Sequence, residues 1–336
     1  MDATLLTLPK IELHRHLEGS WRLETLCAIA REYCLPIPSY EPEEIRPQVQ
    51  IMPDEPHTAE RFLSKFRFLR QFFRSETIIK RVVRETVIDA ATDGIRYMEL
   101  RFTPQALNNI MRVEYDTVIE WVCEESQSAA RNFGIDVRLI VSMNRHEGAS
   151  NAEAVLDAAL AFRDRGVVGL DLAGNENGYP VDPFRMVFRR AKREGLFVTI
   201  HAGEWAGAES IRDAIELLDA DRIGHGIRIL EDPALVAEVA RRGIPLEVCP
   251  NSNVDSGICP HLREHPLPLL MKNGLNVTVN TDDPLISSIS LTDQLAQVME
   301  HLGWALTDVR AAQVNAANAA FLSQEGRAAL LQAMQG

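Results

Sequence analysis

Four side chains in this sequence form a set that could hold one metal ion. His14 and His16 are two residues apart near the N-terminus, and residues two apart on a strand point to the same side, so both imidazoles can reach one ion. His201 and Asp282 each follow an apolar, β-branched run much later in the chain. Because three imidazoles and one carboxylate suit zinc and leave room for water, the set predicts one Zn2+ per subunit.

Further polar residues lie next to these expected ligands. Glu204 stands three residues after His201, where the chain turns towards a helix, so its carboxyl group can donate a proton to a substrate. His225 lies between two glycines and is expected to orient the attacking water, whose pKa a bound cation lowers towards neutrality. Gly174 has no side chain, so its backbone polar groups are accessible to a ligand. Asp283 follows the last predicted strand, where the chain turns, and can contact a heteroatom of the substrate.

Each of these candidate site residues lies at the end of a short β-branched or apolar run or just after one. We therefore expect strands to position them. Amphipathic stretches, with apolar residues at three- and four-residue spacing, separate the runs. Eight strand–helix units in one chain predict an α/β fold, a closed (β/α)8 TIM-type barrel, in which catalytic groups gather at the C-terminal ends of the strands. The predicted strands are Ile11–His14, Arg96–Phe102, Val137–Ser142, Val167–Leu172, Leu196–His201, Arg222–His225, Pro245–Cys249 and Asn276–Thr281.

The first two predicted strands are separated by roughly 80 residues, far more than a normal crossover needs. This stretch contains the helical pattern Ala59–Leu69, and we expect a helical insertion over about residues 20–90 that lies above the catalytic face. Phe62, Leu63 and Phe66 are then expected to form an apolar lid, in which Phe62 and Phe66 contact the substrate. The alternative is that these residues only pack this helix onto the barrel. Since no repeat or linker interrupts the sequence, residues 1–336 are expected to form one barrel domain.

Charge and composition exclude several classes of function. The chain has 48 acidic and 35 basic side chains, a net charge of −13, which argues against a nucleic-acid or membrane-surface partner and favours a small, uncharged substrate. No stretch approaches a membrane span, and the start lacks a basic region followed by a long apolar segment, so we expect a cytoplasmic protein. The five cysteines form no paired framework and are expected to be reduced thiols. These residues give no indication of oligomeric state.

Six motifs, taken in order and with their places at strand ends, resemble the adenosine/adenine deaminase family of the amidohydrolase superfamily. The resemblance runs from about Leu8 to Phe321. The motifs are His14-Arg-His16, Asp171-Leu-Ala-Gly174, His201-Ala-Gly-Glu204, Gly224-His-Gly226, Glu247-Val-Cys-Pro250 and Asn280-Thr-Asp-Asp-Pro284.

The resemblance implies a mononuclear zinc centre on the four expected ligands, and a hydroxide that attacks C6 of a 6-aminopurine with release of ammonia. It also implies that Glu204 protonates ring N1, that His225 assists the hydroxide, and that Asp283 and the Gly174 backbone hold the purine nitrogens. The residues expected in catalysis are Glu204, His225 and Asp282, and those expected to bind the substrate are His16, Glu18, Gly174, Asp283, Phe62 and Phe66.

Two related classes of hydrolase are excluded by the sequence. Zinc deaminases of the cytidine type need a Pro-Cys-x-x-Cys pair, which this chain lacks. Relatives with two metals normally bridge them through a modified lysine at the end of the fourth strand, where this chain has Asp171-Leu-Ala-Gly174. One metal is the expected number.

Glu18 bears on the choice of substrate. Adenosine deaminases typically carry Asp at this position, where it meets the ribose, whereas Glu is shared with members that act on adenine or on modified nucleosides. The segments Glu99–Pro104 and Asn280–Leu285 are more similar to the nucleoside-acting branch, so we expect an adenosine-type nucleoside. The alternatives are a nucleoside with a bulkier 5′ group, such as aminofutalosine, and free adenine. A catalytically silent binding protein is the alternative from another class, and the presence of every ligand and of the acid argues against it.

Overall fold

Eight parallel strands pair in chain order in the computed structural model, which describes residues 3–334. All eight predicted strands are present, and their ends differ from the prediction by a few residues at most. Both faces of the sheet are covered, which explains the nearly continuous apolar and β-branched runs in the sequence. The strands are β1 Lys10–His16, β2 Ile95–Phe102, β3 Asp136–Asn144, β4 Val167–Ala173, β5 Phe197–Ala202, β6 Arg222–His225, β7 Leu246–Val248 and β8 Val277–Val279.

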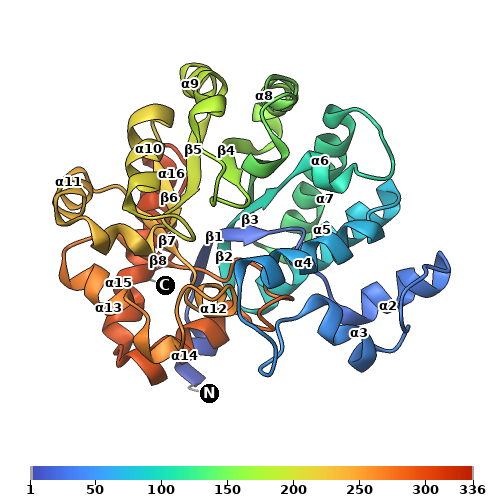
Figure 1. Cartoon of the computed structure of the whole chain (residues 1–336), viewed down its shortest axis with the longest axis horizontal. Coiled ribbons are helices and arrows are strands. Elements are labelled where there is room, and N and C mark those ends of the chain that lie inside the picture. Colours follow the sequence, from blue (N-terminus) through green and yellow to red (C-terminus); the bar gives the residue numbers. More distant parts are fainter. Residues whose placement is uncertain (1–2, 335–336) are drawn as a thin grey trace.

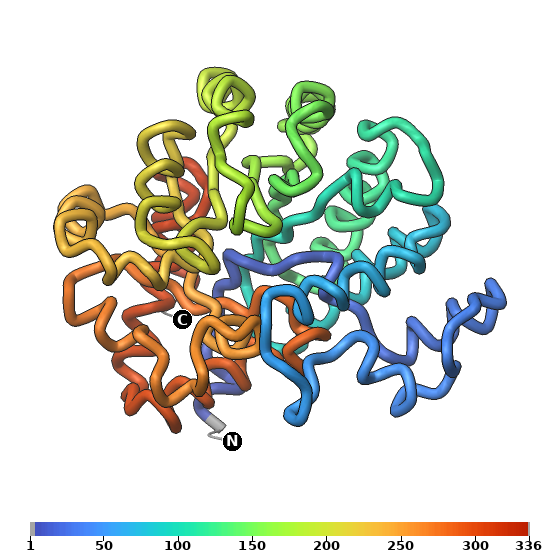
Figure 2. The backbone as a smooth tube through the Cα atoms, in the orientation of Figure 1, coloured from blue at the N-terminus to red at the C-terminus, as the bar shows by residue number. Residues whose placement is uncertain are grey.

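Backbone contacts between β1 and the segment after β8 close the sheet. The N–H of Asp282 donates to the carbonyl of His14, and the N–H of His16 donates to the carbonyl of Asp282, each over 2.9 Å. Arg15 and Asp282 form a β-bridge between the same two segments. Figure 2 shows the dark blue start of the chain beside the orange segment that carries this contact. The predicted (β/α)8 barrel is confirmed.

Helices surround the barrel (Figure 1). Side-chain caps fix several of their first turns: the Ser75 hydroxyl accepts from the N–H of Ile78, and the Asp232 carboxylate accepts from two backbone N–H groups. The α-helices are α1 Ala3–Thr7, α2 Leu23–Glu32, α3 Pro42–Val49, α4 Ala59–Leu69, α5 Glu76–Thr92, α6 Pro104–Leu107, α7 Tyr115–Phe133, α8 Ala152–Ala161, α9 Arg185–Arg193, α10 Ala208–Leu218, α11 Pro233–Arg242, α12 Pro250–Asp255, α13 Leu267–Lys272, α14 Leu291–Leu302, α15 Leu306–Ala319 and α16 Gln324–Ala333. Short 3-10 turns are η1 Arg70–Phe72, η2 Arg145–Glu147, η3 Arg163–Arg165, η4 Asp182–Phe184, η5 Ile227–Glu231 and η6 Leu262–Glu264.

Most of the long connection between β1 and β2 is helical. Its last helix, α5, packs against β2 and α7, where a barrel crossover helix belongs, and α2 and α3 project to one side (Figure 1). The loop residue Glu55 pairs with the buried Lys65 of α4 over 2.7 Å, and Lys65 also donates to the carbonyl of Pro47 in α3 over 2.9 Å. These bonds connect α4 to α3 and hold α4 beside the pocket described below.

The last two helices cover the barrel at the N-terminal ends of its strands. Ile11, Leu13 and Tyr97 form an apolar cluster with alanines of α15. Phe321, just after α15, stacks on Phe197 with the ring centroids 4.7 Å apart. These apolar contacts close the N-terminal end of the barrel. The polar side chains therefore gather at the C-terminal ends of the strands. Among residues 3–334, no helix is long and apolar enough to cross a membrane.

Candidate metal centre and active site

The ligand atoms of four side chains converge where β1, β5 and the segment after β8 meet. They belong to His14, His16, His201 and Asp282. Nε2 of His201 lies 3.1 Å from that of His14 and 3.2 Å from that of His16. Oδ1 of Asp282 lies 3.3 Å from Nε2 of each of the other two histidines. Tetrahedral zinc, with ligands at about 2.0–2.1 Å, separates neighbouring ligand atoms by about 3.3–3.4 Å, so these side chains fit one ion of that size.

Neighbouring side chains orient three of these ligands. Nδ1 of His14 lies 2.8 Å from Oε2 of Glu247, and Nδ1 of His201 lies 2.9 Å from Oδ1 of Asp171. Because each carboxylate accepts from an Nδ1–H, each Nε2 keeps a lone pair that faces the centre of the cluster. The Ser252 hydroxyl donates to Oδ2 of Asp282 over 2.6 Å, which leaves Oδ1 for an ion.

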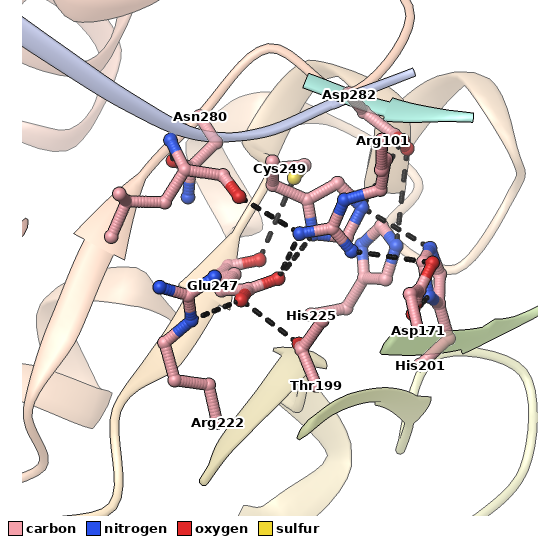
Figure 3. A network of polar contacts seen from close by, with 12 residues as sticks. Arg101, Asp171, Thr199, His201, Arg222, His225, Glu247, Cys249, Asn280 and Asp282 are labelled. Carbon is pink, nitrogen blue, oxygen red and sulfur yellow. Dashed lines mark hydrogen bonds and ion pairs between the residues drawn. The ribbon is translucent and has the colours of Figure 1, made fainter. Parts of the chain in front are cut away.

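Glu247 joins this cluster to charged residues inside the barrel (Figure 3). Its Oε2 also accepts from Arg101 over 2.7 Å, and its Oε1 accepts from Arg222 over 2.6 Å. Arg222 also pairs with Glu99 deeper in the barrel. Burial alone would raise the pKa of Glu247, but the two guanidinium groups hold it well below its ordinary value. The carboxylate therefore stays charged and orients His14.

Glu204 reaches the pocket from the turn after β5. Its carboxyl group is buried, and burial, together with the charges of Asp282 and Glu176, raises the pKa of Glu204 well above its ordinary value. The raised pKa favours the protonated form of this buried carboxyl group.

The turn that carries Glu204 is fixed by the buried carboxylate of Glu176. Four successive backbone N–H groups and one hydroxyl donate to its two oxygens. The donors are Gly203 at 2.9 Å, Glu204 at 2.9 Å, Trp205 at 2.6 Å, Ala206 at 2.9 Å and the Ser210 hydroxyl at 2.7 Å. With every donor of the turn satisfied by one buried anion, the Glu204 backbone is held in one position.

A chain of hydrogen bonds determines which nitrogen of His225 carries a proton. The N–H of Leu267 donates to Nδ1 of His265 over 3.1 Å, so Nε2 of His265 donates to the side-chain oxygen of Asn253, also over 3.1 Å. The amide nitrogen of Asn253 then donates to Nδ1 of His225 over 3.1 Å. Burial lowers the pKa of His225 well below its ordinary value, so the ring is neutral. Its single proton therefore sits on Nε2, which faces Asp282 at 3.8 Å.

Both His225 and Asp282 turn sharply at the ends of their strands. Their φ angles are +59° and +66°, in the left-handed region that residues other than glycine rarely adopt. Such strain persists only where surrounding contacts hold it, and it concentrates at functional sites. Here it directs two polar side chains back into one pocket.

Asp283 lies beside the expected ligand Asp282. Burial and the charge of Asp282 raise the pKa of Asp283 well above its ordinary value, which favours the protonated form of its carboxyl group. Its Oδ1 is buried and has no hydrogen-bond partner among residues 3–334. Gly19 makes this position possible, since a Cβ there would lie 1.9 Å from that oxygen. The carboxyl group of Asp283 is therefore available to a bound molecule.

Glu18 and Gly174 also border the pocket. Oε1 of Glu18 accepts from the N–H of Thr103 over 2.7 Å, whereas Oε2 is buried without a partner in the described part of the chain. Burial raises the pKa of Glu18 to about 7. Gly174 has a φ of +85°, and a Cβ there would lie 2.4 Å from Nδ1 of His146, so a side chain at this position would fill the space between them.

A pocket of about 580 Å³ connects these groups, a volume suited to a small-molecule ligand. Helix α4 supplies one wall through Phe62, Leu63 and Phe66, and the loops after β3 and β4 supply another. Every expected site residue lines the pocket except His14, which is buried beneath it.

Residues 9–335 match the family model of adenosine deaminase. The chain belongs to the adenosine deaminase family. An adenosine deaminase from Klebsiella pneumoniae subsp. pneumoniae is 37% identical over 326 residues, which cover 97% of each protein. As a member of the adenosine deaminase family, the chain is a hydrolase that acts on carbon–nitrogen bonds of cyclic amidines, and the family is metal-dependent.

Solved structures of the adenosine deaminase family and its relatives share this fold. Adenine deaminase from Arthrobacter aurescens superposes with a TM-score of 0.90 at 30% identity, covering 98% of both chains. An amidohydrolase with bound Zn from Burkholderia ambifaria superposes with a TM-score of 0.89 at 28% identity, covering 99% of this chain and 91% of the other.

Several residues that build this deaminase-family site were not singled out from the sequence. Glu176, Ser252 and Asn253 are polar residues in turns or short helices, and nothing local indicates their partners. His265 is buried behind Asn253, and nothing in its polar sequence context indicates this position. His146, just after β3, lines the pocket. The only signal for Glu176 in the sequence is its position two residues after the end of the motif Asp171-Leu-Ala-Gly174.

Proposed function

We propose that this chain catalyses the hydrolytic deamination of a 6-aminopurine nucleoside, with adenosine as the reference substrate. The observation that carries the proposal is that four side chains able to hold a metal ion converge at one pocket, beside the buried carboxyl group of Glu204, whose raised pKa favours its protonated form. Displacement of an amino group from a purine ring needs both, because water must be activated on one side while the neighbouring ring nitrogen gains a proton.

The metal in this proposal is a single zinc ion held by His14, His16, His201 and Asp282. The spacing of their ligand atoms and the carboxylates behind two of the histidines support it. The zinc in the related amidohydrolase from Burkholderia ambifaria supports it as well. When bound, zinc lowers the pKa of water towards neutrality and so supplies the nucleophile.

The remaining steps are assigned to residues of this chain. Glu204 donates its proton to N1 of the purine, which makes C6 open to attack. His225 donates a hydrogen bond from Nε2 and so orients the attacking oxygen and stabilises its charge. Protonated Asp283 donates to an unprotonated ring nitrogen, and the N–H of Gly174 donates to another. The proton that remains on the attacking oxygen passes to the amino group, which leaves as ammonia, and the proton that water loses on activation returns Glu204 to its acid form.

We also propose that the helical insertion acts as a lid in a single domain that spans residues 1–336. Phe62 and Phe66 of α4 line the pocket together with Leu63, so this helix gives the substrate an apolar cover. Excluding water on that side strengthens the polar contacts at the reacting end of the pocket.

The test is an ammonia-release assay on zinc-loaded protein with adenosine, deoxyadenosine and adenine, with the metal content measured on the same preparation. We expect inosine and ammonia in equal amounts from adenosine, and one zinc per chain. Absence of ammonia from all three substrates in protein that contains zinc would contradict the proposed function. It would favour a binding role.

Free adenine is the second candidate substrate. Two observations favour it: Glu18 occupies the position where adenosine deaminases typically carry Asp, and the related structure from Arthrobacter aurescens is an adenine deaminase. A kcat/KM for adenine above that for adenosine in the same assay would select this alternative.

A further inference from the structure

A second group of possible metal ligands lies beside the expected zinc ligands. His225, Cys249 and Asp282 have ligand atoms within 4.8 Å of one another, and all three side chains are buried. By residue type alone, an imidazole, a thiol and a carboxylate could hold a second ion next to the first. We propose that Asn253 keeps the centre mononuclear, because it holds a proton on the nitrogen of His225 that a second ion would need. The inference rests on the proposed function, since it concerns the same metal centre.

The nitrogen that a second ion would need is Nε2 of His225. It lies 3.8 Å from Oδ2 of Asp282, the residue that both groups of ligands share. On the other side of the ring, Nδ1 lies 3.1 Å from the side-chain amide nitrogen of Asn253. An imidazole binds a metal ion through a nitrogen that carries no proton. A proton on Nε2 therefore closes the second position, whether the ring is neutral or carries a proton on Nδ1 as well.

The side chain of Asn253 can present only its N–H groups to His225. An asparagine side chain can face a neighbour with its oxygen or with its nitrogen, and its second partner decides which. Here Nε2 of His265 donates to the oxygen over 3.1 Å, because Nδ1 of His265 already accepts from the N–H of Leu267 over 3.1 Å. Burial lowers the pKa of His265 to about 3, so its ring has a single proton. In the reverse orientation, the amide nitrogen of Asn253 would face the N–H of His265, and two donors would meet.

Backbone hydrogen bonds hold Asn253 in place in α12. Its N–H donates to the carbonyl of Cys249 over 3.0 Å, and its carbonyl accepts from the N–H groups of Ile258 at 3.0 Å and Cys259 at 2.9 Å. The residue is completely buried, so water cannot replace the partners of its side chain. The fold therefore fixes the donor that faces His225.

Two further hydrogen bonds involve the other members of the second group. The Ser252 hydroxyl donates to Oδ2 of Asp282 over 2.6 Å, the same oxygen that faces His225. The thiol of Cys249 donates to the carbonyl of Glu247, with the sulfur and the oxygen 3.5 Å apart. A second ion would compete with the hydroxyl, and it would bind Cys249 as a thiolate whose proton passes to the solvent. The bond from Asn253 is the one that decides which nitrogen of His225 is free.

The experiment titrates the metal-free, full-length protein with Co2+, a coloured ion that binds the same types of ligand as zinc. A thiolate bound to Co2+ adds a charge-transfer band in the near ultraviolet. None of the four expected zinc ligands is a thiol, so a band that Cys249→Ser removes reports the second group alone. For the natural protein we expect one bound ion per chain after excess Co2+ is removed, and no thiolate band.

Asn253→Asp is the variant that should open the second position. A carboxylate accepts a hydrogen bond at this place, so it favours a proton on Nδ1 of His225 and leaves a lone pair on Nε2. We expect a second ion per chain and a thiolate band, both of which are lost when Cys249→Ser is added.

Asn251→Asp is the matched control. It adds the same charge to the same helix, but the amide of Asn251 donates to Gln297 over 2.8 Å and does not contact His225. We expect one ion per chain and no thiolate band in this protein. A second ion in the control as well would assign the effect to the added charge and not to the proton on His225.

A second measurement needs no substitution at Asn253. NMR spectra of the zinc-loaded natural protein, with isotope-labelled histidine nitrogens, show which ring nitrogen of His225 carries a proton, and a sample of His225→Asn assigns the signals. We expect the proton on Nε2. This reading is obtained even if Asn253→Asp does not fold.

Three results would overturn the inference. They are a thiolate band in the natural protein that Cys249→Ser removes, a proton on Nδ1 alone in its NMR spectrum, and a single ion without a thiolate band in folded Asn253→Asp. Ammonia release from adenosine is measured on the zinc-loaded natural protein. If no ammonia appears while the metal readings are as expected, the deaminase function is wrong and the role of Asn253 stands. If the natural protein binds no metal, both are wrong.

Discussion

The proton on Glu204 is the feature of the site that one substitution tests most directly. Glu204→Gln keeps the size and shape of the side chain but removes the transferable proton. We expect kcat to fall by about a hundredfold or more, the scale of general acid catalysis, with the zinc content unchanged. Steady-state kinetics and metal analysis on the same sample check this. Near-normal turnover would assign the acid to another residue.

The pH dependence follows from the same group. Because burial raises the pKa of Glu204 above its ordinary value, the carboxyl group holds its proton below that pKa and loses it as the pH rises through it. We therefore expect kcat/KM to be lost on the alkaline side of a pH profile. The Glu204→Gln variant, which has no proton to lose there, should lack this limb in its residual activity. An identical alkaline limb in both proteins would exclude Glu204 as its source.

Glu18 can be tested for its part in substrate choice. One of its oxygens is held by Thr103, and the other is buried without a partner in residues 3–334, so it is free to accept from a sugar hydroxyl. We expect Glu18→Gln to change the order of kcat/KM among adenosine, adenine and a 5′-modified nucleoside while the zinc content stays the same. An equal decrease for all three substrates would indicate that Glu18 serves the fold or the metal ligands instead.

Among the elements, the strands of the barrel depend on a buried ionic network centred on Arg222. This side chain pairs with Glu99 and Glu247 and lies over the ring of Phe321, with its guanidinium carbon 3.5 Å from the ring centroid. Arg222→Met would leave the buried Glu99 carboxylate without its guanidinium partner and Glu247 with Arg101 alone. We expect the free energy of unfolding to fall by about 3–5 kcal/mol, measured by urea denaturation. The exposed Arg310→Met is the control, and a similar small change in both variants would contradict the prediction.

The sequence allowed the strands to be predicted because each buried parallel strand leaves a local signal, a short apolar run that ends in a polar residue. His14, His201 and Asp282 stand at such ends, and the barrel topology alone brings them together. The bonds behind them leave no such signal. The hydroxyl of Thr281 donates to Glu12 across 269 residues of sequence, and Glu247 contacts His14 across 233. Contacts between residues so far apart in the sequence depend on the register of the strands, and a short sequence pattern does not indicate that register.

At the scale of the whole molecule, the expected ligands tie together the first strand, the fifth strand and the segment after the last. His201→Ala should abolish zinc binding and activity while the barrel still folds, since the site lies outside the packed interior. Added zinc should then raise the melting temperature of the natural protein but not of the variant, because a ligand at a thousandfold excess over its Kd stabilises by about 4 kcal/mol. The exposed His261→Ala serves as the control. Full zinc content in His201→Ala would contradict the ligand assignment.

The closure of the barrel between β1 and Asp282 also has a consequence for how the enzyme is made. During translation, His14 and His16 are synthesised early, and Asp282, the last of the four expected ligands, is synthesised only after most of the chain. A chain that terminates before Asp282 holds three of the four expected ligands and lacks the backbone bonds that join the two ends of the sheet. Deaminase activity should therefore appear late and all at once, with no shorter translation product that carries a fraction of it.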